Sequence, residues 1–82
     1  MDYSKAEKKF IDMVESDRFS KKTVTDYVKA VIENNDIANG IDTVDYYQSG
    51  CISDGQKGYK ACEMARVELY RAYVEDYDRR HK

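Results

Sequence analysis

The chain has 82 residues, of which 41% are hydrophobic and 37% charged, and its formal net charge is −2. A chain of this length forms one small core, so we expect a single domain over residues 1–82 and no deep substrate cavity. The acidic balance argues against a strongly electrostatic nucleic-acid binder. No apolar run or leader indicates a membrane span or secretion, so we expect a cytoplasmic protein.

Proline is absent and glycine occurs only four times, which favours long uninterrupted helices. Apolar residues recur at intervals of three and four along most of the sequence, as they do on one face of a helix. The sequence therefore predicts an all-α fold, namely one small four-helix domain with three main helices and one short helix.

The first helix is expected at residues 5–15. Ser4 and Glu7 have the S-x-x-E spacing of a capping box, in which the two side chains satisfy backbone N–H groups at the helix start. Residues 16–18 carry no apolar periodicity and are expected to form a short connection. The apolar face of this helix comprises Tyr3, Ala6, Phe10, Met13 and Val14.

The second helix has the clearest signals in the chain. Ser20 is expected to be its N-cap, and Phe19 and Val24 have the spacing of a hydrophobic staple around that cap. The helix should end near residues 34–35, because asparagine tolerates the left-handed conformation that follows many helices. Its apolar stripe comprises Val24, Tyr27, Val28, Val31 and Ile32.

A turn at Asn39-Gly40 is expected to separate the second helix from a short third helix. Asp42 would cap this helix and Gly50 would end it, with Ile41, Val44 and Tyr47 facing inward. An Asn-Gly pair is also typical of a hairpin, but the flanking residues do not alternate with period two, which argues against strands.

The longest helix is expected at residues 54–79, after a capping box formed by Ser53 and Gln56. Gly55 and Gly58 weaken its first turn, and they either let another backbone come close or leave that end frayed. The small alanines of the apolar face also leave open a homodimer built through this face. The face comprises Ala61, Cys62, Ala65, Leu69, Ala72 and Tyr73, with Met64 and Val67 along one flank.

One pattern in the second helix resembles a known family. Ser20, Thr23 and Tyr27 follow the order S-x-x-T-x-x-x-Y, with Phe10 before them in the first helix. With a short third and a long fourth helix, this pattern resembles the N-terminal core-binding (SAM-like) domain of tyrosine recombinases, the phage-integrase class. The resemblance covers about residues 6–78 and lacks the catalytic domain, so it implies no recombinase activity.

The resemblance implies DNA or a nucleoprotein complex as the partner, held by the second and fourth helices, as for a binding module of a phage or other mobile element. It points to Lys21, Lys22, Thr25, Lys29, Lys57, Lys60 and Arg66. The lysines near the start of the second helix also suit phosphate, because a helix N-terminus is positively polarised. Asp26 and Glu33 lie among them, so a solvated face of mixed charge is the alternative.

Tyrosine accounts for eight of the ten aromatic residues. Tyrosine is enriched at protein interfaces, although it also seals the edges of small cores, and we expect this second role for Tyr27 and Tyr73. A compact, acidic, tyrosine-rich chain is similar in style to phage proteins that inhibit host defence complexes, such as anti-CRISPR proteins. The alternative partner is therefore a host protein complex, contacted through Tyr46, Tyr47, Tyr59, Tyr70 and Tyr77.

The sequence gives no sign of catalysis, a metal site or a cofactor. The only histidine is His81, and neither Cys51 nor Cys62 belongs to a CxxC pair, so we expect reduced thiols rather than zinc ligands. The carboxylates of the fourth helix have the spacing of simple salt pairs, as in Glu68 with Arg71 and Glu75 with Arg79. We therefore expect a non-catalytic binding protein.

Overall fold

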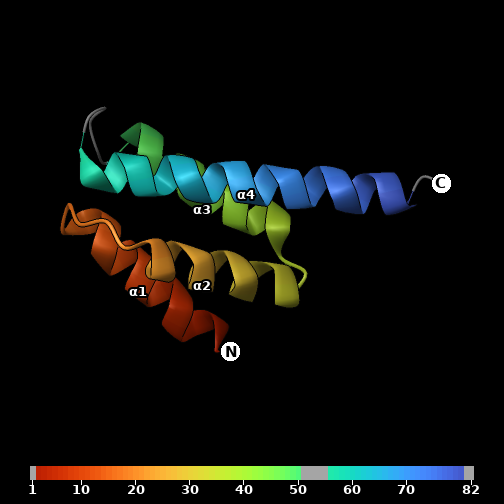
Figure 1. Cartoon of the computed structure of the whole chain (residues 1–82), viewed down its shortest axis with the longest axis horizontal. Coiled ribbons are helices and arrows are strands. Elements are labelled where there is room, and N and C mark those ends of the chain that lie inside the picture. Colours follow the sequence, from red (N-terminus) through yellow and green to blue (C-terminus); the bar gives the residue numbers. More distant parts are fainter. Residues whose placement is uncertain (1, 51–55, 81–82) are drawn as a thin grey trace.

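A computed structural model describes residues 2–50 and 56–80 of the chain, and Figure 1 shows its helices. Helices α1 and α2 run in opposite directions as one pair, and α4 lies across them together with α3 (Figure 1). The predicted all-α, four-helix fold is confirmed, and the described residues contain no strand. The helices are α1 (Tyr3–Glu15), α2 (Lys21–Glu33), α3 (Ile37–Gly50) and α4 (Lys57–Arg80).

Helix α1 begins two residues earlier than predicted, because Asp2 rather than Ser4 is its N-cap. The Asp2 carboxylate accepts a hydrogen bond from the Lys5 backbone N–H at 3.4 Å. Aspartate also suits the positive end of the helix dipole, so it replaces the predicted capping box of Ser4 and Glu7. The predicted apolar face is confirmed for Ala6, Phe10, Met13 and Val14, which are buried, while Tyr3 is half-buried.

Helix α2 begins and ends where the sequence predicts. The Ser20 hydroxyl accepts from the Thr23 backbone N–H at 3.3 Å, and Asn35 adopts a left-handed conformation with a φ of 53° just after the helix. Tyr27 is fully buried and its ring stacks on Phe10 with centroids 4.4 Å apart. Ile32 departs from the prediction, because it leaves the core and is 43% exposed.

Helix α3 is not short, and it does not follow a turn at Asn39-Gly40. It contains 14 residues from Ile37, so the Asn-Gly pair lies inside its first turn and Asp42 is not its cap. The Gly40 N–H already donates to the carbonyl of Asp36 at 3.0 Å, as in a helix. Glycine is needed here for packing rather than for a turn, since a Cβ would lie 2.8 Å from Cγ1 of Val31.

Helix α4 packs closely at its start and leaves the bundle at its end. Gly58 is buried against α1, where an added Cβ would lie 2.5 Å from the Val14 carbonyl oxygen, so this glycine permits a close backbone approach. Tyr73 does not seal the core as predicted, because it is 49% exposed beyond the last buried residue, Leu69. Residues 51–55, which include Cys51 and the predicted cap Ser53, lie outside the described residues.

The alanine face of α4 is occupied within the molecule. Ala61 and Ala65 are fully buried, together with Cys62, in one core cluster that also contains residues of α1, α2 and α3. The homodimer through this face stays a prediction, and in the folded chain Ala61, Cys62 and Ala65 are packed against the other helices. Small side chains here allow α4 to approach them closely.

A candidate binding groove between α2 and α4

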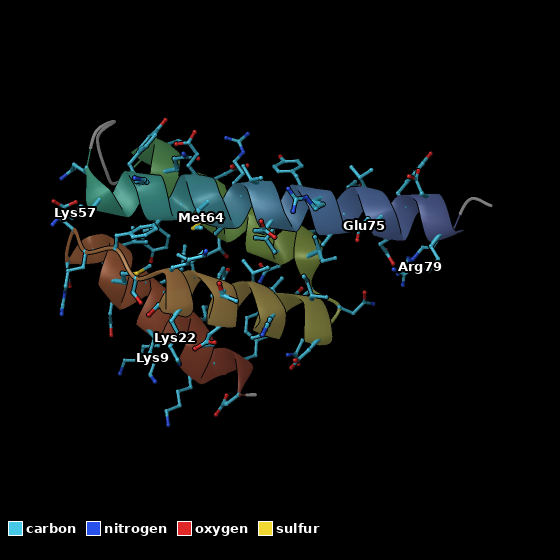
Figure 2. The ribbon with its side chains drawn as sticks, viewed as in Figure 1. Lys9, Lys22, Lys57, Met64, Glu75 and Arg79 are labelled. Carbon is cyan, nitrogen blue, oxygen red and sulfur yellow. The ribbon has the colours of Figure 1, made fainter. Side chains whose placement is uncertain are left out.

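A groove of about 320 Å³ lies between α2 and α4. Its floor is apolar and comprises Val24 and Val28 of α2 and Met64 of α4. Figure 2 shows Met64 pointing from α4 toward α2. The groove is lined by Lys21, Val24, Thr25, Val28, Lys29, Ile32, Met64 and Glu68.

The α2 rim of the groove carries positive charge because of helical spacing. Lys21, Thr25 and Lys29 stand four residues apart, which places them on one side of the helix, next to the buried stripe. All three are exposed. The sequence predicted these residues as nucleic-acid contacts, and the structure brings them to the same groove.

The α4 rim carries the opposite charge. Glu68 lines the groove across from the lysines and lies 3.6 Å from Arg71, which is the salt pair predicted from the i,i+3 spacing. Both groups of that pair are about half exposed, so the pair adds little to stability. A groove with lysines on one rim and a glutamate on the other favours a ligand that carries both charges.

A second hollow of about 310 Å³ adjoins the groove through Met64, which lines both. Phe19 lies in this hollow and is 38% exposed, so the predicted staple residue remains accessible. The Lys60 ammonium lies 5.8 Å from the centre of the Phe19 ring, within the range of a cation–π contact. Glu63 and Val67 complete this hollow. The two hollows share Met64 as a lining residue, and together we call them the channel, which charges of both signs edge.

The other predicted nucleic-acid contacts do not share this groove. Lys22 donates to the Asp26 carboxylate at 3.0 Å, and Figure 2 shows it on the side of α2 away from α4. Arg66 faces α3, where it pairs with Asp45 at 3.4 Å and lies over the ring of Tyr70. Lys57 is exposed at the first turn of α4 (Figure 2).

The five predicted interface tyrosines lie in separate places. Tyr46 and Tyr47 make an edge-to-face pair on α3 and line a hollow shared with α1. Tyr70 lines a different hollow, between α3 and α4, while Tyr59 is half-buried near the start of α4. Tyr77 lies near the end of α4 and is 52% exposed. The tyrosines therefore do not form one continuous surface.

Two tyrosine hydroxyls are withdrawn from water. Burial raises the pKa of Tyr3 to about 12, and the hydrogen bond that its hydroxyl donates to Asp36 at 2.9 Å adds to this effect. Burial also raises the pKa of Tyr27, which lies fully within the core. Both groups stay neutral at physiological pH and brace the core.

The described part of the chain has no cluster of three or more histidine, cysteine, aspartate or glutamate side chains placed to bind a metal ion. Among residues 2–50 and 56–80, no helix combines the length and apolar character needed to cross a bilayer. Cys62 is buried in the core, in agreement with its predicted role as a small apolar side chain.

In comparisons with protein-family models, curated proteins and solved structures, no match to this chain is found. The likeness to recombinase core-binding domains stays a prediction from the residues of α2.

Five lining residues of the groove were not identified as site residues from the sequence, namely Val24, Val28, Ile32, Met64 and Glu68. Ile32 was assigned to the buried stripe, and Met64 to a flank of the apolar face. The sequence holds no signal for the exposure of Ile32, because adjacent residues such as Tyr27 and Val28 do share the core. The role of Met64 depends on how α4 lies against α2, which the sequence pattern does not determine.

Proposed function

We propose that this chain is a non-catalytic binding protein whose groove between α2 and α4 accepts a helical segment of a partner protein. The observation that carries the proposal is the accessible apolar surface of this channel. Ile32 (43% exposed), Phe19 (38% exposed) and the half-buried Met64 provide it, above the buried Val24 and Val28. Helix-in-groove recognition uses such a channel to hold the apolar face of an amphipathic helix.

The length of the groove sets the length of the guest. Its α2 wall extends from Lys21 to Ile32, which corresponds to about 17 Å along the helix axis, or three turns of a guest helix. A guest of that length presents apolar residues at positions i, i+3 or i+4, and i+7. Ile32, Phe19 and Met64 supply most of the affinity, because their apolar surface is still accessible to a guest, and the charged rims select the orientation of the guest.

The charges on the two rims predict the chemistry of the guest. Lys21 and Lys29 favour acidic residues on one edge of the guest helix, and Glu63 and Glu68 favour basic residues on the other. This arrangement fits a small adaptor or inhibitor of a host protein complex. A host protein complex is the alternative partner predicted from the sequence.

DNA or a nucleoprotein complex is a second candidate partner. It is supported by the shared position of Lys21, Thr25 and Lys29 on one rim, with Lys60 across the channel. A DNA complex built on these lysines would weaken steeply with salt, because each neutralised phosphate releases a counterion. Glu63 and Glu68 oppose this candidate, since they line the same channel and would repel phosphates.

A pull-down from host lysate separates the two candidates. Three variants are compared with the wild-type chain as baits. Ile32→Asp replaces an exposed apolar side chain of the groove with a carboxylate, and a double variant combines Lys21→Glu with Lys29→Glu. Val74→Asp is the control. Val74 is 54% exposed on α4 outside the groove, so it matches Ile32 in exposure and branching. Each capture is repeated after nuclease treatment and at higher salt.

Capture of a protein that survives nuclease and is lost only with Ile32→Asp supports the groove as a protein site. Nucleic acid that is lost with the double lysine variant, and at higher salt, supports the second candidate instead. A captured protein that binds Ile32→Asp as well as it binds the wild type contradicts the proposal, because the apolar side chain of Ile32 then contributes nothing to binding.

A further inference from the structure

A hollow of about 360 Å³ lies between α1 and α3 and shares no lining residue with the channel. It lies where the two helices are apart, because both pack on α2 and α4 and hardly on each other. We call it the α1–α3 hollow. It is lined by Glu7, Ile11, Asp42, Thr43, Tyr46 and Tyr47.

Helical spacing brings these side chains together. On α1, Glu7 and Ile11 are four residues apart, so they lie on the same side of the helix. On α3, Asp42 and Tyr46 have the same spacing, which places a carboxylate one turn before an aromatic ring. The hollow therefore combines carboxylates from two helices with the rings of one.

The charge of the α1–α3 hollow is negative only. Glu7 and Asp42 are its charged residues, and no lysine or arginine lines it. Burial is the main cause of the raised pKa of Tyr27, and the negative charge of Glu7 adds to it, so the field of this carboxylate reaches the core. The ion pairs within the described part of the chain use other carboxylates, namely those of Asp26, Asp45, Glu68 and Asp76.

Two tyrosine rings complete the hollow. Tyr46 and Tyr47 meet edge to face, with centroids 5.2 Å apart and an interplanar angle of 88°. Tyr46 is 66% exposed, so a ligand has access to its ring. The face of a tyrosine ring attracts a cation through its quadrupole. The rings and the carboxylates therefore favour the same class of ligand, an organic cation.

The molecule uses the same combination of groups elsewhere to hold a guanidinium. Arg66 pairs with Asp45 of α3 at 3.4 Å, and its guanidinium lies 5.4 Å from the centre of the Tyr70 ring. One carboxylate and one tyrosine are thus enough to position an arginine side chain. Asp42 and Tyr46 repeat this combination in the α1–α3 hollow, where the described residues supply no cation of their own.

We propose that the α1–α3 hollow binds an arginine side chain of a partner protein. Glu7 and Asp42 accept hydrogen bonds from its guanidinium, and Tyr46 packs against the guanidinium plane. Arginine fits better than lysine, because a planar guanidinium stacks on an aromatic ring while it donates in several directions. The same carboxylates repel the phosphates of a nucleic acid. This site does not depend on the guest helix proposed for the channel.

The exposure of the hollow sets the expected affinity. Each ion pair and each cation–π contact is weak at an exposed site, so one arginine alone binds in the millimolar range. The hollow therefore serves as one contact within a larger interface. An arginine within a chain also lacks the free carboxylate that Glu7 and Asp42 would repel, which favours a protein over the free amino acid.

An NMR titration of the ¹⁵N-labelled chain tests the proposal. The probe is N-acetyl-arginine amide, whose blocked ends imitate an arginine within a chain. Amide signals of residues 7–11 and 42–47 should shift, with half-saturation at about 10 mM, as expected for a few weak contacts.

Three further compounds identify the chemistry that the hollow recognises. N-acetyl-citrulline amide has the same shape without the charge and should bind at least about 10-fold more weakly. N-acetyl-lysine amide and free L-arginine should each bind about 3-fold more weakly than the probe, the first for its geometry and the second for its carboxylate.

Two variants and two controls identify the residues. Asp42→Asn and Tyr46→Leu should each weaken binding of the probe by about 5-fold, because each removes one contact. Both residues are exposed, and the amide spectrum of each variant checks that it is folded. Glu15→Gln changes an exposed glutamate of α1 outside the hollow and should leave binding unchanged. Ile32→Asp should also leave it unchanged, so this site and the channel are tested by different variants.

Binding that prefers the probe to its citrulline analogue and depends on Asp42 and Tyr46 supports the proposal. Equal binding of the citrulline analogue overturns it, because the charge of the guanidinium then contributes nothing. Equal binding of the lysine analogue overturns the assignment to arginine, and tighter binding of free L-arginine overturns the assignment to a partner protein. Signal shifts that Asp42→Asn does not reduce also overturn the proposal, because the probe then binds elsewhere.

Discussion

The two halves of α4 form one continuous helix but have opposite surroundings. Its first half, residues 57–69, is held by Gly58, Ala61, Ala65 and Leu69, which are buried against the other helices. Its second half, residues 70–80, contains no buried residue and exposes tyrosine and valine side chains. Small residues at helical spacing permit close packing, whereas bulky residues at the same spacing remain available for another molecule.

The largest test of this contrast is a pair of truncations to alanine. Leu69→Ala should lower the free energy of unfolding by about 3 kcal/mol, because it leaves a cavity in the core. Val74→Ala, five residues later in the same helix, should change it by less than about 0.5 kcal/mol. Urea denaturation measures both. Equal losses would show that the second half of α4 is packed in solution.

A glycine in the first half gives the next largest effect. In an exposed helix Gly→Ala stabilises by about 1 kcal/mol, but Gly58→Ala should destabilise by roughly 2 kcal/mol. The reason is that the new Cβ meets the Val14 carbonyl oxygen, which belongs to the backbone and cannot turn aside. Gly40→Ala is the comparison and should cost less, because its Cβ would lie 2.8 Å from Cγ1 of Val31, a smaller overlap than the 2.5 Å at Gly58. Thermal unfolding of both variants ranks them.

A smaller effect on stability is expected at alkaline pH from Tyr3, at the start of α1. The pKa of Tyr3 is about 12 in the folded chain, against an ordinary value of 10.0. Between these values the unfolded chain loses a proton that the folded chain keeps, so stability falls as pH rises. Tyr3→Phe should cost about 1 kcal/mol at neutral pH and make the alkaline fall shallower. An unchanged pH slope in urea titrations would contradict the assignment.

The smallest effect is expected from removing the end of α4. A chain ending at Ala72 keeps every buried residue of this helix, so its unfolding free energy should fall by less than about 1 kcal/mol. Amide hydrogen exchange on the intact chain should agree, with slow exchange near Ala65 and Leu69 and fast exchange after Val74. Strong protection after Val74 would contradict this prediction.

Much of the fold could be predicted because local signals and packing agree. For α2 the cap at Ser20, the periodic stripe and the stop near Asn35 all indicate one helix, and the structure confirms each of them. For α3 the local signals and the packing disagree, since Asn39 and Gly40 favour a turn locally. The helix forms nevertheless, because Gly40 lets Val31 and Leu69 come close. That contact joins residues distant in the sequence, so no local pattern could predict it.

The candidate site divides in the same way. The shared side of Lys21, Thr25 and Lys29 follows from the period of one helix. The opposite wall, with Met64 and Glu68, depends on how two helices cross, which periodicity does not determine. The positions of the tyrosines depend on packing in the same way, because Tyr46 and Tyr47 line a hollow beside α1, whereas Tyr70 lines another between α3 and α4.

The connection between α1 and α2 has a consequence for the order of folding. Asp17 adopts a left-handed conformation with a φ of 54°, and its carboxylate accepts from the Gly58 N–H at 3.2 Å, 41 residues later in the chain. The first turn of α4 thus takes an acceptor from the turn that ends α1, so this contact joins segments far apart in the sequence. Substituting Asp17 should therefore speed unfolding more than it slows folding, because this contact closes late.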